Sequence, residues 1–503
     1  MSKPISMRRT GLVVFSARIG SVFTGLAFLL LMTRSLSTQQ FGLWEVILDV
    51  VTFASYPAGF IVYWATRDIA RGQMRGRTAL GINLALSSLG IALYLVLSFF
   101  TAGPVHAGWA TFLLAILLVP IAYWNQAGNA IVSGHDPAVG GYAVISSEAC
   151  KLLVALPALL LFHTGIDGVI LALMSANAAQ AATSTYLCRD ALKLPFDLAV
   201  GRRWMTRSWL TSLTSIPYVV GIADTYIASL AAGGTVLVGH YQAAFAVATL
   251  AGYSSYLAVA LYPLLLRGGA SEELPSITLD LSLLFGIPMA VGAAALAKPI
   301  LFVLKERSYL DGTDALMVLA FAALVVAVAS VLDQTLSGRV TVDADDSAGF
   351  RHFVHSDLFF VFLVNFGSTV VYIVSVFLIV LAGRGQGTDL APTLDAWALA
   401  QLVVYSAFLA LRVPRVRRGG GKLSLRPSFF RYVAGAAIMG AFLYVASDLL
   451  LSYSARSLDF AVEAGAVGAA GAAIYFGFVF ATDATFRRLA RRLLRPITSP
   501  GAP

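Results

Sequence analysis

Long apolar runs constrain this chain more than any other feature of its sequence. Runs of 18 or more predominantly apolar residues recur along nearly the whole length of the 503 residues. Each run can cross a hydrocarbon core of about 30 Å as an α-helix, which rises about 1.5 Å per residue. Because a bilayer offers no water to the backbone, such runs span it as helices whose hydrogen bonds close internally.

The composition excludes a soluble globular protein. The sequence is 58% hydrophobic and only 12% charged, with a mean hydropathy of +0.80. An average soluble domain carries about 25% charged residues to cover its surface. We therefore predict an all-α polytopic membrane protein, with membrane lipids as its surroundings.

The hydropathy pattern predicts about fourteen transmembrane helices. Turn-forming segments such as GHDPAVGG (134–141) separate most of the apolar runs. The predicted spans are 11–33, 41–65, 79–101, 109–132, 141–162, 166–187, 208–231, 236–266, 276–298, 313–336, 356–382, 395–412, 430–451 and 460–482.

The distribution of basic residues predicts the orientation. With the N-terminus inside, 27 of the 35 Lys and Arg fall in cytoplasmic segments and six on the outside. This asymmetry follows the positive-inside rule and places both termini in the cytoplasm. The net charge of +9 is thus a topology signal, and because the basic residues are spread over separate loops we expect no nucleic-acid partner.

The loops leave no room for a dedicated catalytic domain, since each has about twenty residues or fewer. Cys150, Cys188 and the six histidines show no metal-binding spacing, so we expect no metal and no cofactor. A membrane-embedded glycosyltransferase would need carboxylates at the outer mouth, and the first outer turn, 34–40, has none. We therefore predict a transporter and no enzyme, with the glycosyltransferase as a third alternative.

The chain divides into two predicted lobes. The basic segment 188–207 separates the first twelve spans into six and six, and both halves begin on the same side, as parallel repeats do. We predict an N-terminal lobe (1–200), a C-terminal lobe (201–412), and a third part (413–503) with a basic loop, spans 13 and 14 and a basic cytoplasmic tail. The second helix of each lobe opens alike, with FGLWE (41–45) and VGHYQ (238–242).

These motifs carry a family resemblance. The turn RSLSTQQFGLWEV (34–46), the Asp224-containing seventh span, VGHYQAAFAVA (238–248) and ALYPLLLR (260–267) resemble the polysaccharide flippases of the multidrug/oligosaccharidyl-lipid/polysaccharide (MOP) exporter superfamily. The resemblance implies a cytoplasmic-membrane protein that flips isoprenoid (pyro)phosphate-linked oligosaccharides by alternating access, with no oligomer required. A cation-coupled drug or metabolite antiporter of the same fold is the alternative.

Charged residues inside the predicted spans each need a reason, since an ionised side chain at mid-membrane costs roughly 2.5–3.5 kcal/mol on insertion scales. Arg18 and Lys151 are predicted to bind the substrate phosphate from the inner half of the first lobe. In the alternative, Arg18 reaches the cytoplasmic headgroups and Lys151 is neutralised by Glu148, three residues away on one helix face. These two cations favour the flippase over an exporter of cationic drugs.

Carboxylates in the spans are candidates for coupling to H+ or Na+. Asp49 in span 2 and Asp224 in span 7 lie at comparable depth in the outer half, and Glu148 is the third candidate. Pairing of one of them with Arg34 or with a backbone donor is the alternative. Asp333, near the inner end of span 10, is expected to be an interfacial residue.

Polar and proline residues complete the candidate site. Trp124, Asn125 and Asn129 in span 4 could contact sugar rings and hydroxyls, or instead join helices by hydrogen bonds. Pro57 and Pro217 remove a backbone hydrogen bond inside a span, and we predict that they act as hinges. The outer turn at 34–40 and its counterpart at 231–241 would then form the rims of an external gate.

Overall fold

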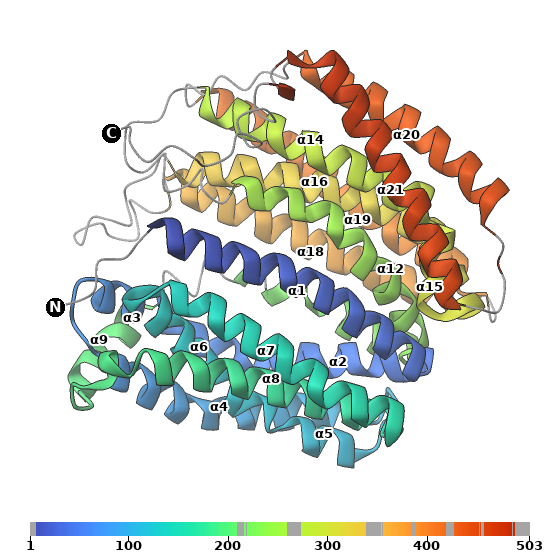
Figure 1. The fold of residues 1–503 in the computed structure, drawn as a ribbon. Coiled ribbons are helices and arrows are strands. Elements are labelled where there is room, and N and C mark those ends of the chain that lie inside the picture. Colours follow the sequence, from blue (N-terminus) through green and yellow to red (C-terminus); the bar gives the residue numbers. More distant parts are fainter. Residues whose placement is uncertain are drawn as a thin grey trace. The chain divides into compact units, whose positions relative to one another are not determined.

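A computed structural model describes most of the chain. It covers residues 7–208, 216–258 without 218, 273–338, 354, 356–384, 389–418, 427–451, 453 and 457–487 without 485. Side chains of most residues in 7–22 lie outside this description, as does the basic tail predicted beyond residue 487. The described residues form helices and connecting turns, with no strand among them (Figure 1).

The described residues fall into two compact units. The first comprises residues 1–242 and 376–385, and the second comprises 243–375 and 386–503. Helices α12 (Val236–Gly252) and α18 (Asp357–Gly383) contribute residues to both units.

Helices of the first unit begin with the long α1, whose course beside α7 is visible in Figure 1. In order they are α1 (Met7–Ser35), α2 (Thr38–Ser55), η1 (Tyr56–Phe60), α3 (Val62–Ala70), α4 (Gly76–Ala102), α5 (Trp109–Ala115), α6 (Leu118–His135), α7 (Ala138–Leu156), η2 (Pro157–Leu161), α8 (Ile166–Leu187), η3 (Arg189–Leu192), α9 (Leu198–Arg207) and α11 (Ala223–Ala232).

Helices of the second unit begin with a short 3-10 turn and end with a long antiparallel pair. In order they are η4 (Tyr253–Ala258), α14 (Leu274–Ala295), α15 (Ala297–Lys305), η5 (Glu306–Gly312), α16 (Thr313–Ser337), α19 (Ala391–Arg418), α20 (Ser428–Leu450) and α21 (Ser457–Thr482).

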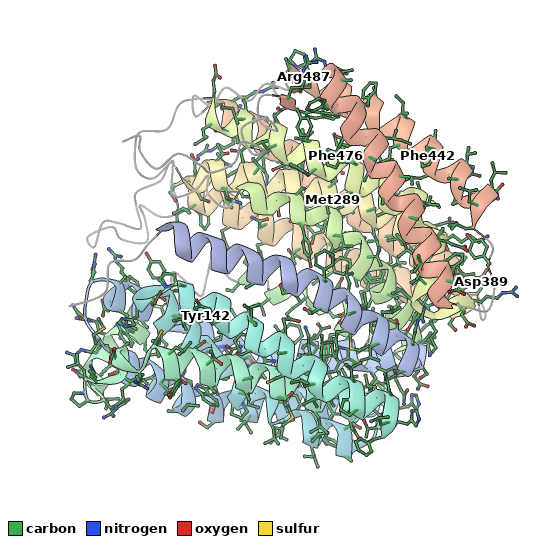
Figure 2. All side chains as sticks on the ribbon, viewed as in Figure 1. Tyr142, Met289, Asp389, Phe442, Phe476 and Arg487 are labelled. Carbon is green, nitrogen blue, oxygen red and sulfur yellow. The ribbon has the colours of Figure 1, made fainter. Side chains whose placement is uncertain are left out.

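The predicted spans all contain helix, which confirms the all-α fold class. Among the described residues, nine helices are long and apolar enough to cross a membrane, or ten if the bent pair Thr38–Phe60 and Val62–Ala70 is one span. The count of fourteen therefore stays a prediction. Large apolar side chains such as Tyr142 and Met289 lie at the surface, where lipid would cover them (Figure 2).

Helix packing in the first unit brings together helices that are neighbours in sequence and helices that are far apart in it. Helix α7 packs against α1 and α8, and α6 packs against α3, α4 and α8. Several buried polar groups are paired between helices, as the Tyr94 hydroxyl of α4 shows by donating to the Phe112 carbonyl of α5 at 2.8 Å. Such pairing is required where water is absent, because an unpaired buried polar group costs free energy.

The two C-terminal helices pack on α14 of the second unit. Their shared apolar core includes Leu284, Met439 and Tyr475. The Tyr475 hydroxyl donates to the Leu284 carbonyl at 2.8 Å, and Ser428 at the start of α20 donates to Asp280 of α14 at 2.5 Å. Helices α20 and α21 are therefore an integral part of the second unit.

The segment between the predicted lobes contains helix that the hydropathy pattern did not predict. It forms η3 and the amphipathic helix α9, which begins where the Asp197 side chain accepts the backbone N–H groups of Ala199 and Val200. Asp197 also pairs with Arg75 at 3.0 Å. Gly201 lies where α9 approaches α4, and a Cβ there would meet the end of the Ile82 side chain, which would have to move.

Candidate functional site

Lys151 and Glu148 form an ion pair inside α7. The Lys151 Nζ lies 2.6 Å from Glu148 Oε2, and the two side chains are 14% and 20% exposed. Their spacing of three residues places both on one face of the helix, as the sequence predicted. The neutralising contact between them is therefore present. A Lys ammonium has three donors, so this contact does not by itself exclude a second anion.

Helix α1 covers this ion pair. The Thr24 hydroxyl donates to Glu148 Oε2 at 2.5 Å, and the Lys151 Nζ lies 5.3 Å from the centre of the buried Phe28 ring. Thr24 and Phe28 are one turn apart, so they present one face of α1 to α7. Thr24 was missed from the sequence. Its position four residues before the aromatic Phe28, on one helix face, was the available signal.

Arg18 lies in the same helix, six residues before Thr24 and therefore about 9 Å away along the axis. Its backbone is helical, but its side chain lies outside the described residues. Whether Arg18 joins Lys151 on a phosphate stays a prediction.

Asp49 and residues of α11 form the second polar cluster of the first unit. The Thr225 hydroxyl donates to the Asp49 carboxylate. Asp224 and Glu45 lie close enough to Asp49 to interact with it electrostatically. The backbone N–H of Thr225 donates to Asp224 at 2.8 Å. The structure therefore brings the predicted carboxylates of α2 and α11 to one place, and adds a hydroxyl that the sequence analysis did not consider.

Tyr226 connects this cluster to its neighbours. The Thr101 hydroxyl of α4 lies 3.2 Å from the Tyr226 hydroxyl, and the Tyr226 ring packs edge-on against Phe53 of α2 with ring centres 5.9 Å apart. These contacts fix the position of α11 relative to α2 and α4 within the unit. Among the described residues, no group of three or more His, Cys, Asp or Glu has the arrangement of a metal site.

Two glycines allow the N-terminal ends of α2 and α12 to approach closely. A Cβ on Gly42 would overlap the Thr235 carbonyl, and a Cβ on Gly239 would overlap the Thr38 carbonyl. The buried Thr235 hydroxyl also donates to the Gln39 carbonyl at 2.8 Å. These glycines are the ones that the repeated motif contains, and the close backbone approach explains why glycine stands there.

Pro57 lies at a bend in the second predicted span. It is the second residue of the 3-10 helix η1, and the axes on either side of the break differ by 41°. The buried Tyr123 of α6 donates its hydroxyl to the Ala54 carbonyl at 3.0 Å, next to the bend. A neighbouring helix thus supplies a donor where the regular ladder is interrupted. Motion at Pro57 stays a prediction, as does a hinge at Pro217, which is helical and buried.

The polar residues of α6 lie in different surroundings. The Asn125 amide donates to Asn177 of α8 at 3.2 Å, so it joins two helices, as the alternative interpretation expected. Asn129 is exposed, and Trp124 lines a surface groove between α4, α6 and α8. The structure therefore does not bring the three together on one surface, and glycan contact by any of them stays a prediction.

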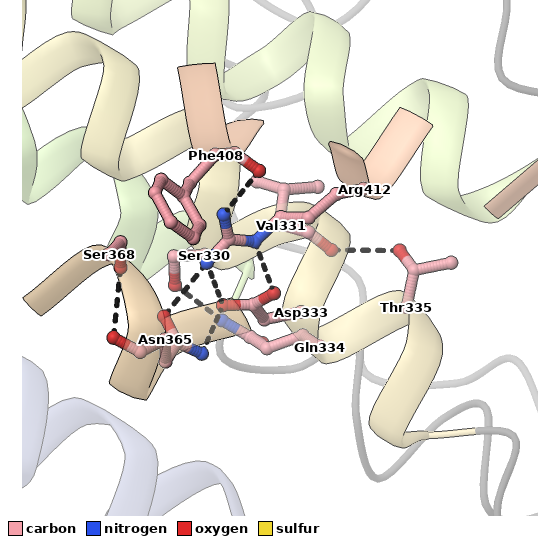
Figure 3. Close-up of polar contacts among 9 residues, drawn as sticks. All are labelled: Ser330, Val331, Asp333, Gln334, Thr335, Asn365, Ser368, Phe408 and Arg412. Carbon is pink, nitrogen blue, oxygen red and sulfur yellow. Dashed lines mark hydrogen bonds and ion pairs between the residues drawn. The ribbon is translucent and has the colours of Figure 1, made fainter. Parts of the chain in front are cut away.

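Arg412 in the second unit is a buried cation that the sequence analysis did not single out; it is the last residue of the predicted span 395–412. Its side chain is 3% exposed, and its Nε donates to Asp333 at 2.7 Å (Figure 3). It also donates to the Asn365 side chain at 2.8 Å and to the Phe408 carbonyl at 2.9 Å. Asp333, expected at the interface, is thus part of a hydrogen-bonded network that joins α16, α18 and α19.

Solved structures of similar fold match most of the chain. A lipid II flippase, MurJ, in an inward-closed conformation matches with a TM-score of 0.63 and 14% identity, over 96% of this chain and 99% of that chain. This chain has the fold of a MOP transporter. An inward-facing multidrug resistance MATE transporter of the MOP superfamily matches with a TM-score of 0.56 and 14% identity, over 78% of this chain and 94% of that chain.

An outward-facing MATE transporter gives a TM-score of 0.51 at 14% identity, over 83% of this chain and 95% of that chain. No family model matches the sequence, and no curated protein is similar to it in sequence. The likeness therefore concerns the fold, and it confirms the fold that the sequence motifs implied.

Proposed function

We propose that this protein is a transporter that flips isoprenoid (pyro)phosphate-linked oligosaccharides across the cytoplasmic membrane by alternating access, with both termini in the cytoplasm. The observation that carries the proposal is the membrane-embedded Lys151, held by Glu148 against α1. A lipid phosphate needs a cation where water is scarce, and a buried ammonium interacts with it strongly. The match to a lipid flippase over 96% of the chain supports the same proposal.

The ion pair also gives a route to release. Glu148 occupies one donor of Lys151 when no substrate is bound, and it competes with the substrate phosphate for the ammonium. The free energy of phosphate binding is thus reduced by the loss of the Lys151–Glu148 ion pair. This ion pair forms again when the phosphate leaves. In this account Arg18 contributes the second cation, and Asp49 and Asp224 bind the coupling H+ or Na+. Asn125 and Asn129 are candidate contacts of the glycan.

A matched control for Lys151 exists in the same unit. Lys193 also follows its partner, Asp190, by three residues, with 2.8 Å between the charged atoms, but the two side chains are 73% and 64% exposed. The experiment measures the transport of a fluorescent polyprenyl-diphosphate glycan in proteoliposomes. We expect Lys151→Ala to raise the apparent KM about 10- to 100-fold, since a hydrogen bond to a charged group is worth about 1.5–3 kcal/mol.

Lys193→Ala should leave transport unchanged. Glu148→Gln removes the competitor, so we expect a lower KM together with slower turnover. Equal transport by the Lys151→Ala and Lys193→Ala variants, with both monodisperse in detergent, would show that Lys151 does not bind substrate.

The clustered carboxylates favour a second candidate function. Asp49 interacts with Asp224 and Glu45, and the MATE transporters share the fold. Such a cluster suits a cation-coupled antiporter of drugs or metabolites. In the same proteoliposomes, uptake of an organic cation driven by a proton or sodium gradient, and lost in Asp49→Asn, would favour the antiporter over the flippase.

A further inference from the structure

A surface groove runs between α4, α6 and α8 of the first unit, with η3 at one end. Its volume is about 610 Å³. The residues that line it include Leu84, Trp124, Ala182, Tyr186, Arg189 and Leu192. On α8 and η3 they recur at positions 182, 185, 186 and 189, the spacing of a single helix face.

The depth of the groove matches one leaflet of a bilayer. Helix α4 begins at this end of the unit, whereas α6 and α8 end there. Trp124 lies eleven residues before His135, the last residue of α6, and is therefore about 16 Å from that end. Half of a hydrocarbon core of roughly 30 Å is about 15 Å. The groove thus runs from the level of the headgroups to about the middle of the membrane.

The part of the groove nearer the middle of the membrane is apolar, and it opens on the surface of the protein. Leu84 and Tyr186 are exposed large side chains, and Ala182 leaves space between them. Trp124 supplies a ring at the inner end. These surfaces suit an alkyl chain, because burying apolar area is favourable.

The mouth of the groove is basic. The Arg189 guanidinium lies 5.2 Å from the centre of the Tyr186 ring, which holds it at the edge of the groove. Arg77 is exposed one turn before Leu80 on the same face of α4. The neighbouring Asp190 pairs with Lys193 at 2.8 Å. A planar guanidinium on an aromatic ring is well suited to a phosphate group.

The segment after η3 marks the level of the membrane surface. Leu194, Phe196 and Leu198 are exposed apolar side chains, and they lie between the basic residues of η3 and α9. Apolar side chains flanked by cations are typical of segments that rest in the headgroup region. Arg189 is therefore at the depth where lipid phosphates lie.

We propose that this groove binds one anionic phospholipid of the surrounding leaflet, with an acyl chain along Leu84, Ala182 and Trp124 and its phosphate on Arg189. The leaflet is the one on the η3 side, which the charge distribution predicts to be cytoplasmic. An anionic lipid is favoured over a zwitterionic one because Arg77 and Arg189 add two positive charges at the mouth, and a choline headgroup would bring a third.

Brominated lipids test the proposal with Trp124 as the reporter. Purified protein is reconstituted in phosphatidylcholine with a small fraction of phosphatidylglycerol or phosphatidylcholine that carries bromine on its acyl chains, which quenches nearby tryptophan. We expect brominated phosphatidylglycerol to quench more at equal mole fraction. This excess should disappear in Trp124→Phe and in Arg189→Ala, and it should remain in Arg202→Ala, which removes an exposed arginine at the same end of the unit.

A groove-filling variant gives independent evidence. Ala182→Phe should abolish the excess quenching, whereas Ala92→Phe, at an exposed position of α4 outside the groove, should preserve it. An excess that persists in Trp124→Phe, or equal quenching by the two lipids, would overturn the proposal. Displacement of the brominated lipid by inorganic phosphate or by a polyprenyl phosphate at lower concentration would overturn it too, and would assign the groove to that ligand.

Discussion

At the residue scale, the sequence showed which charges lie inside helices, but it showed their partners only where both residues lie on one helix. The pairing of Glu148 with Lys151 follows from a spacing of three on one helix, and the structure confirms it. Asp333 and Arg412 are 79 residues apart, so their contact depends on the packing of α16 against α19. Nothing in the sequence singled out Arg412, because it is the last residue of the predicted span 395–412.

The Arg412 network predicts a large penalty when it is broken. Removal of one partner leaves an uncompensated buried charge, which costs about 3–5 kcal/mol. Arg412→Met should therefore lower the free energy of unfolding, measured by titration with sodium dodecyl sulfate, by about that amount. Arg415→Met is the matched control, since Arg415 pairs with Asp357 at 2.8 Å but is 42% exposed, and such pairs are worth about 0–1 kcal/mol.

A double-variant cycle separates pairing from packing. The variant with both Arg412→Met and Asp333→Leu should lose less stability than the sum of the two single variants, because no unpaired charge remains. Additive losses would mean that the two side chains stabilise the second unit independently, in contradiction to the network.

At the element scale, apolar periodicity predicted where helices occur but not where they break. All fourteen predicted spans contain helix, yet the second is divided into α2, η1 and α3. Pro57 was the available signal for that bend. The break also depends on Tyr123 of α6, whose hydroxyl reaches the Ala54 carbonyl, and such a contact has no trace in local sequence. Helices η3, α9 and α15 were missed because they are short or amphipathic.

The close approach of α2 and α12 predicts an external gate that can be locked. Cysteines at positions 38 and 235 should be joined by a short thiol crosslinker, since Thr235 already contacts Gln39. Crosslinking is expected to lower the rate of transport of the labelled glycolipid at least about tenfold. Cleavage of the linker is expected to restore that rate.

The background for this experiment follows from the native thiols. Burial raises the pKa of the Cys188 thiol to about 12, so it stays protonated and unreactive at neutral pH, and only Cys150 needs replacement. Each single-cysteine variant, treated identically, serves as control. Unimpaired transport by the crosslinked protein would show that these two helix ends do not separate during transport.

At the scale of the whole molecule, the fold was predictable at 14% identity to known structures because membrane insertion conserves hydropathy and topology more than residue identity. The first compact unit extends to residue 242. Substrate specificity was not predictable in the same way. The role of Lys151 or Asp49 depends on which groups each side chain faces, and the sequence shows only that these charges lie in membrane helices.

The most direct test of the central claim is transport by the wild-type protein of two fluorescent lipids that carry the same glycan. One bears a polyprenyl diphosphate and the other a neutral lipid anchor, and arrival in the outer leaflet of proteoliposomes is measured by dithionite bleaching. The account predicts that the diphosphate lipid crosses at least about tenfold faster than in protein-free vesicles, and that the neutral lipid does not. Equal rates for the two lipids, or no movement of either, would contradict it.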